Sequence, residues 1–153
     1  MKVSTRVRYA VRALLDVAIT GGPGPVSLRR ISDRQQISLL YLQQLVRPLI
    51  AGGLVKSTRG PGGGLTLTRP ADAITLSEIF RTIEGSFTPV DCVADPESCP
   101  RTPSCVTRDV WVEVETAVNR VLESTTLGDL ARRQQEREQS APRKIRDSEG
   151  KTD

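Results

Sequence analysis

All three cysteines of the chain fall in one polar segment, residues 91–105. Cys92, Cys99 and Cys105 are separated by proline, aspartate, glutamate and serine residues, which offer little apolar material to bury a thiol. Thiolates bind soft metals, so these side chains and one further ligand could hold a tetrahedral zinc ion or an iron–sulfur cluster. Thiols alone could instead act as a redox switch.

The spacing of the cysteines narrows these alternatives only in part. Gaps of six and five residues separate them, whereas zinc sites commonly contain a Cys-x-x-Cys pair, so the spacing disfavours a zinc knuckle. Composition does not separate zinc from an iron–sulfur cluster. A further alternative is that the cysteines have no function, but such cysteines rarely cluster in a polar loop. An odd cysteine count without an export signal argues for a reducing cytoplasm. No window approaches the ~20 apolar residues of a membrane span, so we expect a cytoplasmic protein without membrane contact.

Positive charge is concentrated in the first half of the chain. Residues 1–70 carry 11 Lys and Arg against 2 Asp and Glu, whereas residues 71–133 carry 6 against 11. The net charge of +4 therefore understates the positive field of the first half. Such a field is typical of a module that binds nucleic acid, although a merely solvated basic face is the alternative.

Apolar periodicity predicts the helices of this basic half. One helix covers residues 7–18, a second follows the N-cap Ser27, and a third begins after the N-cap Ser38. Pro48 is expected to kink or shorten the third helix. Its buried stripe is predicted to consist of Leu42, Leu45, Val46, Leu49 and Ile50.

Two short strands follow, at residues 54–58 and 65–68, joined by the sequence RGPGGG. Their alternation of Leu and Thr is typical of half-buried strands. Two helices with a tight connection, followed by a hairpin with a basic tip, predict a winged helix-turn-helix. The fold class is therefore mainly α with a small β-wing, in which the second helix of the motif lies in the major groove of double-stranded DNA.

The third helix and the wing supply the candidate DNA-binding residues. A glutamine amide can pair with adenine, and Arg59 at the wing tip could enter a minor groove. Glycine at the tip allows the backbone to approach the duplex closely. The alternative for each residue is a polar side chain that faces solvent. The candidates are Ser38, Tyr41, Gln43, Gln44, Arg59 and Gly60.

The second half of the chain predicts a helix closed by Gly85, the cysteine loop and a long helix. Thr75 and Glu78 have the spacing of a capping box. In residues 109–123 an apolar seam at Trp111, Val114, Val118 and Val121 predicts a dimerisation helix, with packing onto its own domain as the alternative.

We therefore divide the chain into four parts: a DNA-binding domain (1–85), a cysteine loop (86–108), a dimerisation helix (109–133) and a disordered tail (134–153). The chain has no histidine and no nucleophile with a base at recognisable spacing, so we expect no enzyme.

These motifs together resemble the IscR/NsrR-type family of bacterial, dimeric, winged-helix regulators that sense through an iron–sulfur cluster. The resemblance covers about residues 1–133. It rests on VRYAVRALLDVA, ISLLYLQQLVRPLIAGGLVKSTRGPGGGLTL, the three cysteines and CVTRDVWVEVE. It implies Cys92, Cys99 and Cys105 as cluster ligands, Gln43 and Arg59 as DNA readers, and residues 109–123 as the dimer helix.

The sequence departs from the IscR pattern at two positions. Arg108 stands where IscR-like proteins supply a histidine ligand, which leaves the fourth ligand unassigned. An oxygen of Asp91, Glu97, Asp109 or Glu113, or a small molecule, could provide it, and Asp109 is favoured by its nearness alone. Gln43 stands where the pattern has Glu. Similarity to the IscR branch favours a 2Fe–2S cluster, with 4Fe–4S as the alternative. The resemblance thus implies a homodimeric repressor under iron–sulfur control; the competing interpretation is a zinc-stabilised or thiol-redox DNA-binding protein.

Overall fold

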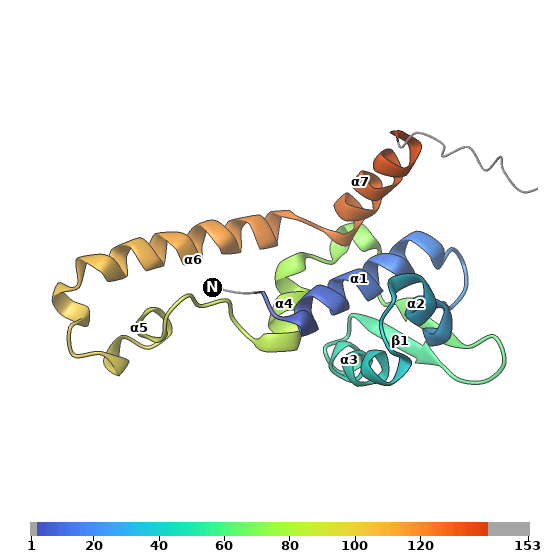
Figure 1. The fold of residues 1–153 in the computed structure, drawn as a ribbon, viewed down its shortest axis with the longest axis horizontal. Helices are drawn as coiled ribbons and strands as arrows, with labels where there is room; N and C mark the ends of the chain where they lie inside the picture. Colours follow the sequence, from blue (N-terminus) through green and yellow to red (C-terminus); the bar gives the residue numbers. More distant parts are fainter. Residues whose placement is uncertain (1–2, 141–153) are drawn as a thin grey trace, which may run out of the picture.

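Helices dominate the architecture, and one two-stranded antiparallel sheet accompanies them (Figure 1). The computed structural model describes residues 3–140. None of its helices combines the length and apolar character needed to cross a bilayer. The elements are α1 (Thr5–Thr20), α2 (Leu28–Gln35), α3 (Leu39–Ala51), β1 (Val55–Thr58), β2 (Gly64–Leu67), α4 (Leu76–Glu84), α5 (Asp91–Ala94), α6 (Val106–Ser124) and α7 (Leu127–Ser140).

Helices α1 to α4 and the β1–β2 hairpin form a winged helix-turn-helix around an aliphatic core. Fully buried side chains from each helix meet there, including Leu14, Ile31, Leu42 and Ile79. The hairpin pairs Val55 with Leu67 at its base and Thr58 with Gly64 near its tip. The predicted fold class, mainly α with a β-wing, is confirmed.

Side-chain caps fix where the helices of this domain begin. The hydroxyl groups of Ser27 and Ser38 each accept a hydrogen bond from a backbone N–H in the first turn of α2 and α3. Thr75 and Glu78 form the predicted capping box at the start of α4. These polar residues satisfy N–H groups that otherwise lack a partner inside a helix, so the starts of these helices agree with the predictions.

One prediction for α3 is wrong, and one of the two alternatives for Pro48 is excluded. Ile50 was expected in the buried stripe but is 41% exposed, because it lies at the edge of the helix face that packs on the core. Pro48 does not shorten the helix, which continues to Ala51. Near the end of a helix, proline removes only one backbone hydrogen bond, and the burial of Leu49 holds the last turn against the core.

Helix α6 leaves the winged helix-turn-helix as an arm. Figure 1 shows α6 reaching far from α1 to α4, with α5 and its flanking loop running beside it. The connection contains two short 3₁₀ helices, Pro96–Ser98 and Thr102–Ser104. The helix predicted over residues 109–123 lies within α6, which ends at Ser124, and a separate helix begins at Leu127 inside the range 109–133 that was assigned to dimerisation.

The predicted disordered tail begins too early. Residues 134–140 belong to α7, and only 141–153 lie outside the described residues. Two features explain the helix despite its polar composition. Thr126 and Asp129 cap its start through reciprocal hydrogen bonds, and Leu127 is buried in the core. Its remaining residues are mostly Arg, Gln and Glu, which have high helix propensity and need no burial to continue a helix that is anchored at one end.

Candidate functional site

Helix α3 presents a polar face to solvent on the side opposite its buried stripe. Gln43 and Gln44 are exposed, and so is Arg47 one turn further on. Within residues 3–140 none of these three side chains makes a hydrogen bond. The predicted readers Gln43 and Gln44 are therefore available to an external partner. Sequence reasoning missed Arg47, although its spacing of four and three residues from the two glutamines places it on the same helix face.

The other two α3 candidates have partners inside the domain. The Ser38 hydroxyl accepts from the backbone N–H of Tyr41 at 3.3 Å, so its oxygen serves as the helix cap. The Tyr41 ring is half-buried and lies edge-on to Tyr9, with 5.9 Å between ring centroids. Both residues therefore position the start of α3. For contacts outside the domain, only the hydroxyl proton of Ser38 and the hydroxyl group of Tyr41 remain.

The wing tip carries Arg59 and Gly60, both exposed. Gly60 adopts a φ of 92°, a conformation that side chains rarely tolerate, and its carbonyl accepts from the N–H of Gly63. Strand β2 is hydrogen-bonded to the segment before α2 in both directions between Val26 and Leu65, at 2.8 Å each, one residue from the tip pair Thr58–Gly64. Arg59 thus extends from a tip whose flanking strand is fixed to the domain.

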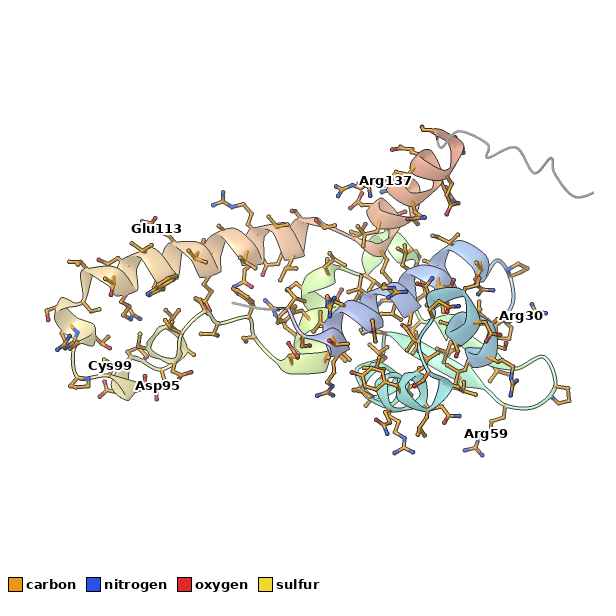
Figure 2. All side chains as sticks on the ribbon, viewed as in Figure 1. Arg30, Arg59, Asp95, Cys99, Glu113 and Arg137 are labelled. Atoms are coloured by element: carbon orange, nitrogen blue, oxygen red, sulfur yellow. The ribbon has the colours of Figure 1, made fainter. Side chains whose placement is uncertain are left out.

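Exposed basic side chains also lie on the elements next to α3. Arg29 and Arg30 of α2 and Lys56 of β1 are exposed and were not singled out from the sequence. Figure 2 shows Arg30 and Arg59 at the end of the molecule remote from Cys99. Part of the positive charge of residues 1–70 therefore lies on exposed side chains of α2, α3 and the wing.

The three cysteines lie at different points of the loop. Cys92 is in α5, Cys99 follows the first 3₁₀ helix, and Cys105 immediately precedes α6. All three are free thiols with intermediate exposure. Within residues 3–140, no three His, Cys, Asp or Glu side chains lie close enough together to hold one metal ion. The structure therefore keeps the predicted ligands on one loop without assembling them around a common centre, and Asp109 is exposed in the first turn of α6.

The surroundings of Cys105 favour ionisation of its thiol. Its sulfur lies 3.1 Å from the hydroxyl of Thr107, and this contact, followed by the backbone N–H of Arg108, holds the pKa of the Cys105 thiol below its ordinary value. The thiolate is the form that attacks electrophiles and binds metals.

Arg108 connects the loop to α6. Its Nε donates to the backbone carbonyl of Cys92 at 2.9 Å, across 16 residues of sequence. A guanidinium cannot ligate a metal, since it has no lone pair to offer at neutral pH. The residue at the position of the family's histidine ligand therefore holds the loop in place by a hydrogen bond.

The inner end of α6 is joined to the DNA-binding domain by backbone hydrogen bonds as well as by side chains. The N–H of Leu76 donates to the carbonyl of Thr125, and the N–H of Leu127 donates to that of Ile74, both at 2.9 Å. Arg81 of α4 also pairs with Glu123 at 3.1 Å. The helix that follows the cysteine loop is thereby attached to the DNA-binding domain at its inner end.

An apolar groove lies where α1, α4 and α6 meet. Its volume is about 410 Å³, and its walls include Val7, Val11, Phe80, Phe87, Val118 and Leu122. Other large apolar side chains of α6 face solvent: Val106, Val110, Trp111 and Val121 are 41–77% exposed. The predicted seam is therefore divided, since Val118 packs on its own domain whereas Trp111 and Val121 do not.

A winged helix-turn-helix with a basic exposed face defines a DNA-binding protein. Residues 3–133 match the model of the Rrf2 family, described as an iron-dependent transcriptional regulator, and the chain belongs to this family. It is thus a transcription regulator that binds DNA, and the predicted kinship with IscR is confirmed. Its relatives are transcriptional regulators and not enzymes, as expected.

Similar proteins in this family include CymR and IscR regulators. The chain is 43% identical to CymR of Bacillus subtilis over 131 residues, which is 86% of this chain and 90% of CymR. It is 38% identical to IscR of Escherichia coli over 135 residues, 88% of this chain and 83% of IscR.

Two solved structures have similar folds. That of B. subtilis CymR, described as the global cysteine regulator, has a TM-score of 0.75 at 41% identity, covering 87% of this chain and 98% of CymR. That of T. potens IscR has a TM-score of 0.74 at 39% identity, covering 90% of each chain.

Proposed function

We propose that this protein is a homodimeric repressor, acting in the cytoplasm, whose operator binding is controlled by an iron–sulfur cluster. One observation carries the proposal: all three cysteines lie on a loop that Arg108 ties to α6, and α6 is itself hydrogen-bonded to the DNA-binding domain. A structural change in the cysteine loop can therefore be transmitted through α6 to the domain that binds DNA.

The donor set fits a cluster in its chemistry. Three free, partly exposed thiols are the usual ligands of iron–sulfur clusters, and the lowered pKa of Cys105 favours the ligating thiolate. Cys92, Cys99 and Cys105 would hold the cluster, of the 2Fe–2S type in preference to 4Fe–4S, with Asp109 as a fourth, oxygen ligand. When bound, such a cluster supplies a centre that oxidants, nitric oxide or iron shortage can alter.

The chain's own residues would transmit this change. Ligation must draw the three cysteines together, which moves Cys92 and the Arg108 side chain bonded to its carbonyl. Arg108 is part of α6, and α6 meets α4 at the junction of residues 124–127.

Helix α4 in turn packs on the end of α3, where a Cβ at Gly52 would lie 2.6 Å from Thr82. A coupling of about 1–3 kcal/mol, the usual allosteric range, would change operator affinity about 5- to 150-fold.

Dimerisation follows from the apolar surface that one chain leaves exposed. Trp111 and Val121 of α6 face solvent, and the groove between α1, α4 and α6 offers apolar walls for a partner helix. Burying both would remove large apolar areas from water. A two-fold dimer would also present two α3 helices to successive major grooves of an operator.

The DNA contacts we propose use the face around α3 and the wing. Gln43 and Gln44 would read base edges, with adenine as the natural partner of an amide. Arg59 would enter the minor groove, and Gly60 would let the wing backbone come close to it. Ser38 and Tyr41 would contact phosphates through their hydroxyl groups.

Anaerobic purification tests the proposal directly. We expect a coloured protein that contains iron and acid-labile sulfide, and whose affinity for a selected operator duplex changes when the cluster is removed. Cys92→Ala, Cys99→Ala and Cys105→Ala should each lose iron while keeping the circular dichroism and dimer mass of the wild type, because none of the three thiols belongs to the core. Protein that contains neither iron nor sulfide would refute iron–sulfur control.

Direct thiol control is the second candidate. The lowered pKa of Cys105 favours it, since a thiolate is the species that oxidants attack. It predicts colourless protein whose operator binding responds to peroxide, and in which Cys105→Ser removes the response. A colourless protein with bound zinc and no response to peroxide would instead indicate a structural metal.

A further inference from the structure

Leu40 is an apolar side chain that the fold leaves uncovered. It is 69% exposed, the highest value among the large apolar residues of the described DNA-binding domain, residues 3–85. Most other exposed apolar residues lie on α6, and Val3 lines the groove between α1, α4 and α6. Leu40 belongs to neither group, because it lies in the first turn of α3.

The position of Leu40 on the helix places it with the polar face of α3. Gln43, Gln44 and Arg47 follow it by three, four and seven residues, the spacing of one helix face. All four side chains are exposed, whereas Leu42 between them is fully buried. A leucine therefore stands in line with the residues that we propose to read DNA.

The charge around Leu40 indicates which kind of partner would cover its exposed side chain. Residues 1–70 carry a large excess of positive charge, which favours a polyanion over a second protein surface at this face. Base edges in the major groove offer hydrogen-bonding groups and one apolar group, the C5 methyl of thymine. A leucine can use only the last of these.

We propose that Leu40 contacts a thymine methyl group in each half-site and so specifies thymine at that position. This inference rests on the DNA-binding face of the proposed function and is independent of the cluster. Gln43 or Gln44, one turn further along α3, would read the neighbouring base pair through its amide. Removal of the methyl group from that thymine therefore weakens binding, although every hydrogen bond between protein and DNA is kept.

Deoxyuridine provides the test, because it pairs like thymidine but lacks the methyl group. The probe is a duplex selected by the wild-type dimer from a random pool, in which each thymine is replaced in turn by deoxyuridine. At one position per half-site we expect affinity to fall roughly 3- to 5-fold, the effect of burying one methyl group. Leu40→Ala should bind the two duplexes equally, and Leu40→Met should retain the difference.

Ile50→Ala is the matched control. Ile50 is also an exposed apolar residue of α3 but lies at the other end of the helix, so this variant should keep the full sensitivity to deoxyuridine. Circular dichroism should be unchanged in all three variants, since neither side chain belongs to the core.

Three results would overturn the inference. The first is a selected duplex without any position sensitive to the methyl group, which would leave DNA binding itself intact. The second is a Leu40→Ala variant that still binds the thymine duplex more tightly than the deoxyuridine duplex, by the same factor as the wild type, which would indicate a role in the fold or a wedge between bases. The third is failure of the wild type to select any sequence, which would remove the DNA-binding face of the proposed function as well.

Discussion

Arg34 of α2 and Asp16 of α1 form an ion pair inside the winged helix-turn-helix, with 2.6 Å between Nη2 and Oδ2. The Nε of Arg34 also donates to Oδ1 at 2.9 Å, and the pairing raises the pKa of the guanidinium. Asp16 is 4% exposed, whereas Arg34 is 38% exposed. The pair fixes the packing of α2 on α1, and with it the helix-turn-helix.

The two members of this pair should differ in their contribution to stability. Arg34→Ala leaves a buried carboxylate with only the weak contact to Gln35, so we expect the free energy of unfolding to fall by about 2–4 kcal/mol. Asp16→Ala should cost only about 1–2 kcal/mol, because Arg34 can turn its charge to water. Urea denaturation measures both, and an equal or larger cost for Asp16→Ala would contradict the prediction.

Gly128→Ala should destabilise the packing of α7 against the rest of the protein. A Cβ at this buried glycine would lie 1.9 Å from the carboxylate of Asp72, which is held by Arg132, and 3.1 Å from the Asp72 backbone nitrogen. We expect a loss of about 1–3 kcal/mol of stability by thermal or urea unfolding, as in other overpacked sites. Gly24→Ala is the matched control, since nothing lies within 4 Å of its Cβ and it should be neutral.

The cap of α7 should weaken at low pH. Hydrogen bonds from the backbone N–H and then the hydroxyl of Thr126, followed by Arg132, lower the pKa of Asp129 from 3.8 to about 2. A lowered pKa means that this stabilisation is complete above pH 3.8 and disappears as the pH falls towards about 2.

Asp129→Asn cannot titrate and provides the comparison for the cap of α7. The difference in melting temperature between wild type and variant should shrink as the pH is lowered from about 5 to about 2. A constant difference across this range would show that the Asp129 carboxylate does not contribute to the cap.

Arg59→Ala should weaken operator binding and reduce the salt dependence of the association constant. Loss of one cation from the wing removes about one released counterion, so the slope of log K against log salt should fall by about one unit. Arg133→Ala carries the same charge change on α7, away from the wing, and should leave the isotherm unchanged. An unaltered isotherm for Arg59→Ala would remove this residue from the interface.

Local signals predicted most of the fold. Ser27, Ser38 and Thr75 mark helix starts because a side-chain oxygen must satisfy N–H groups there, and the glycine-rich wing needs backbone conformations that few other residues adopt. The extent of α7 could not be predicted in this way. It depends on the docking of Leu127 and Gly128 against residues more than fifty positions earlier, which composition does not reveal.

The residue types of the candidate site could be predicted from the sequence better than the positions of their side chains. Gln43, Gln44 and Arg59 are exposed, as expected of readers. Leu40 was missed because it has no hydrogen-bonding group, and Arg47 was missed because readers were expected only in the first turns of α3. The hydrogen bond from Arg108 to Cys92 depends on the path of the loop, and sequence alone showed only an arginine in place of a histidine.

The junction at residues 124–127 has a consequence for how such regulators diversify. Two of its hydrogen bonds, from Leu76 to Thr125 and from Leu127 to Ile74, join main-chain groups, so they do not depend on which side chains stand at these positions. The residues of the outer arm can therefore be substituted while these two hydrogen bonds persist. A different chemistry in the cysteine loop needs no change in the winged helix-turn-helix.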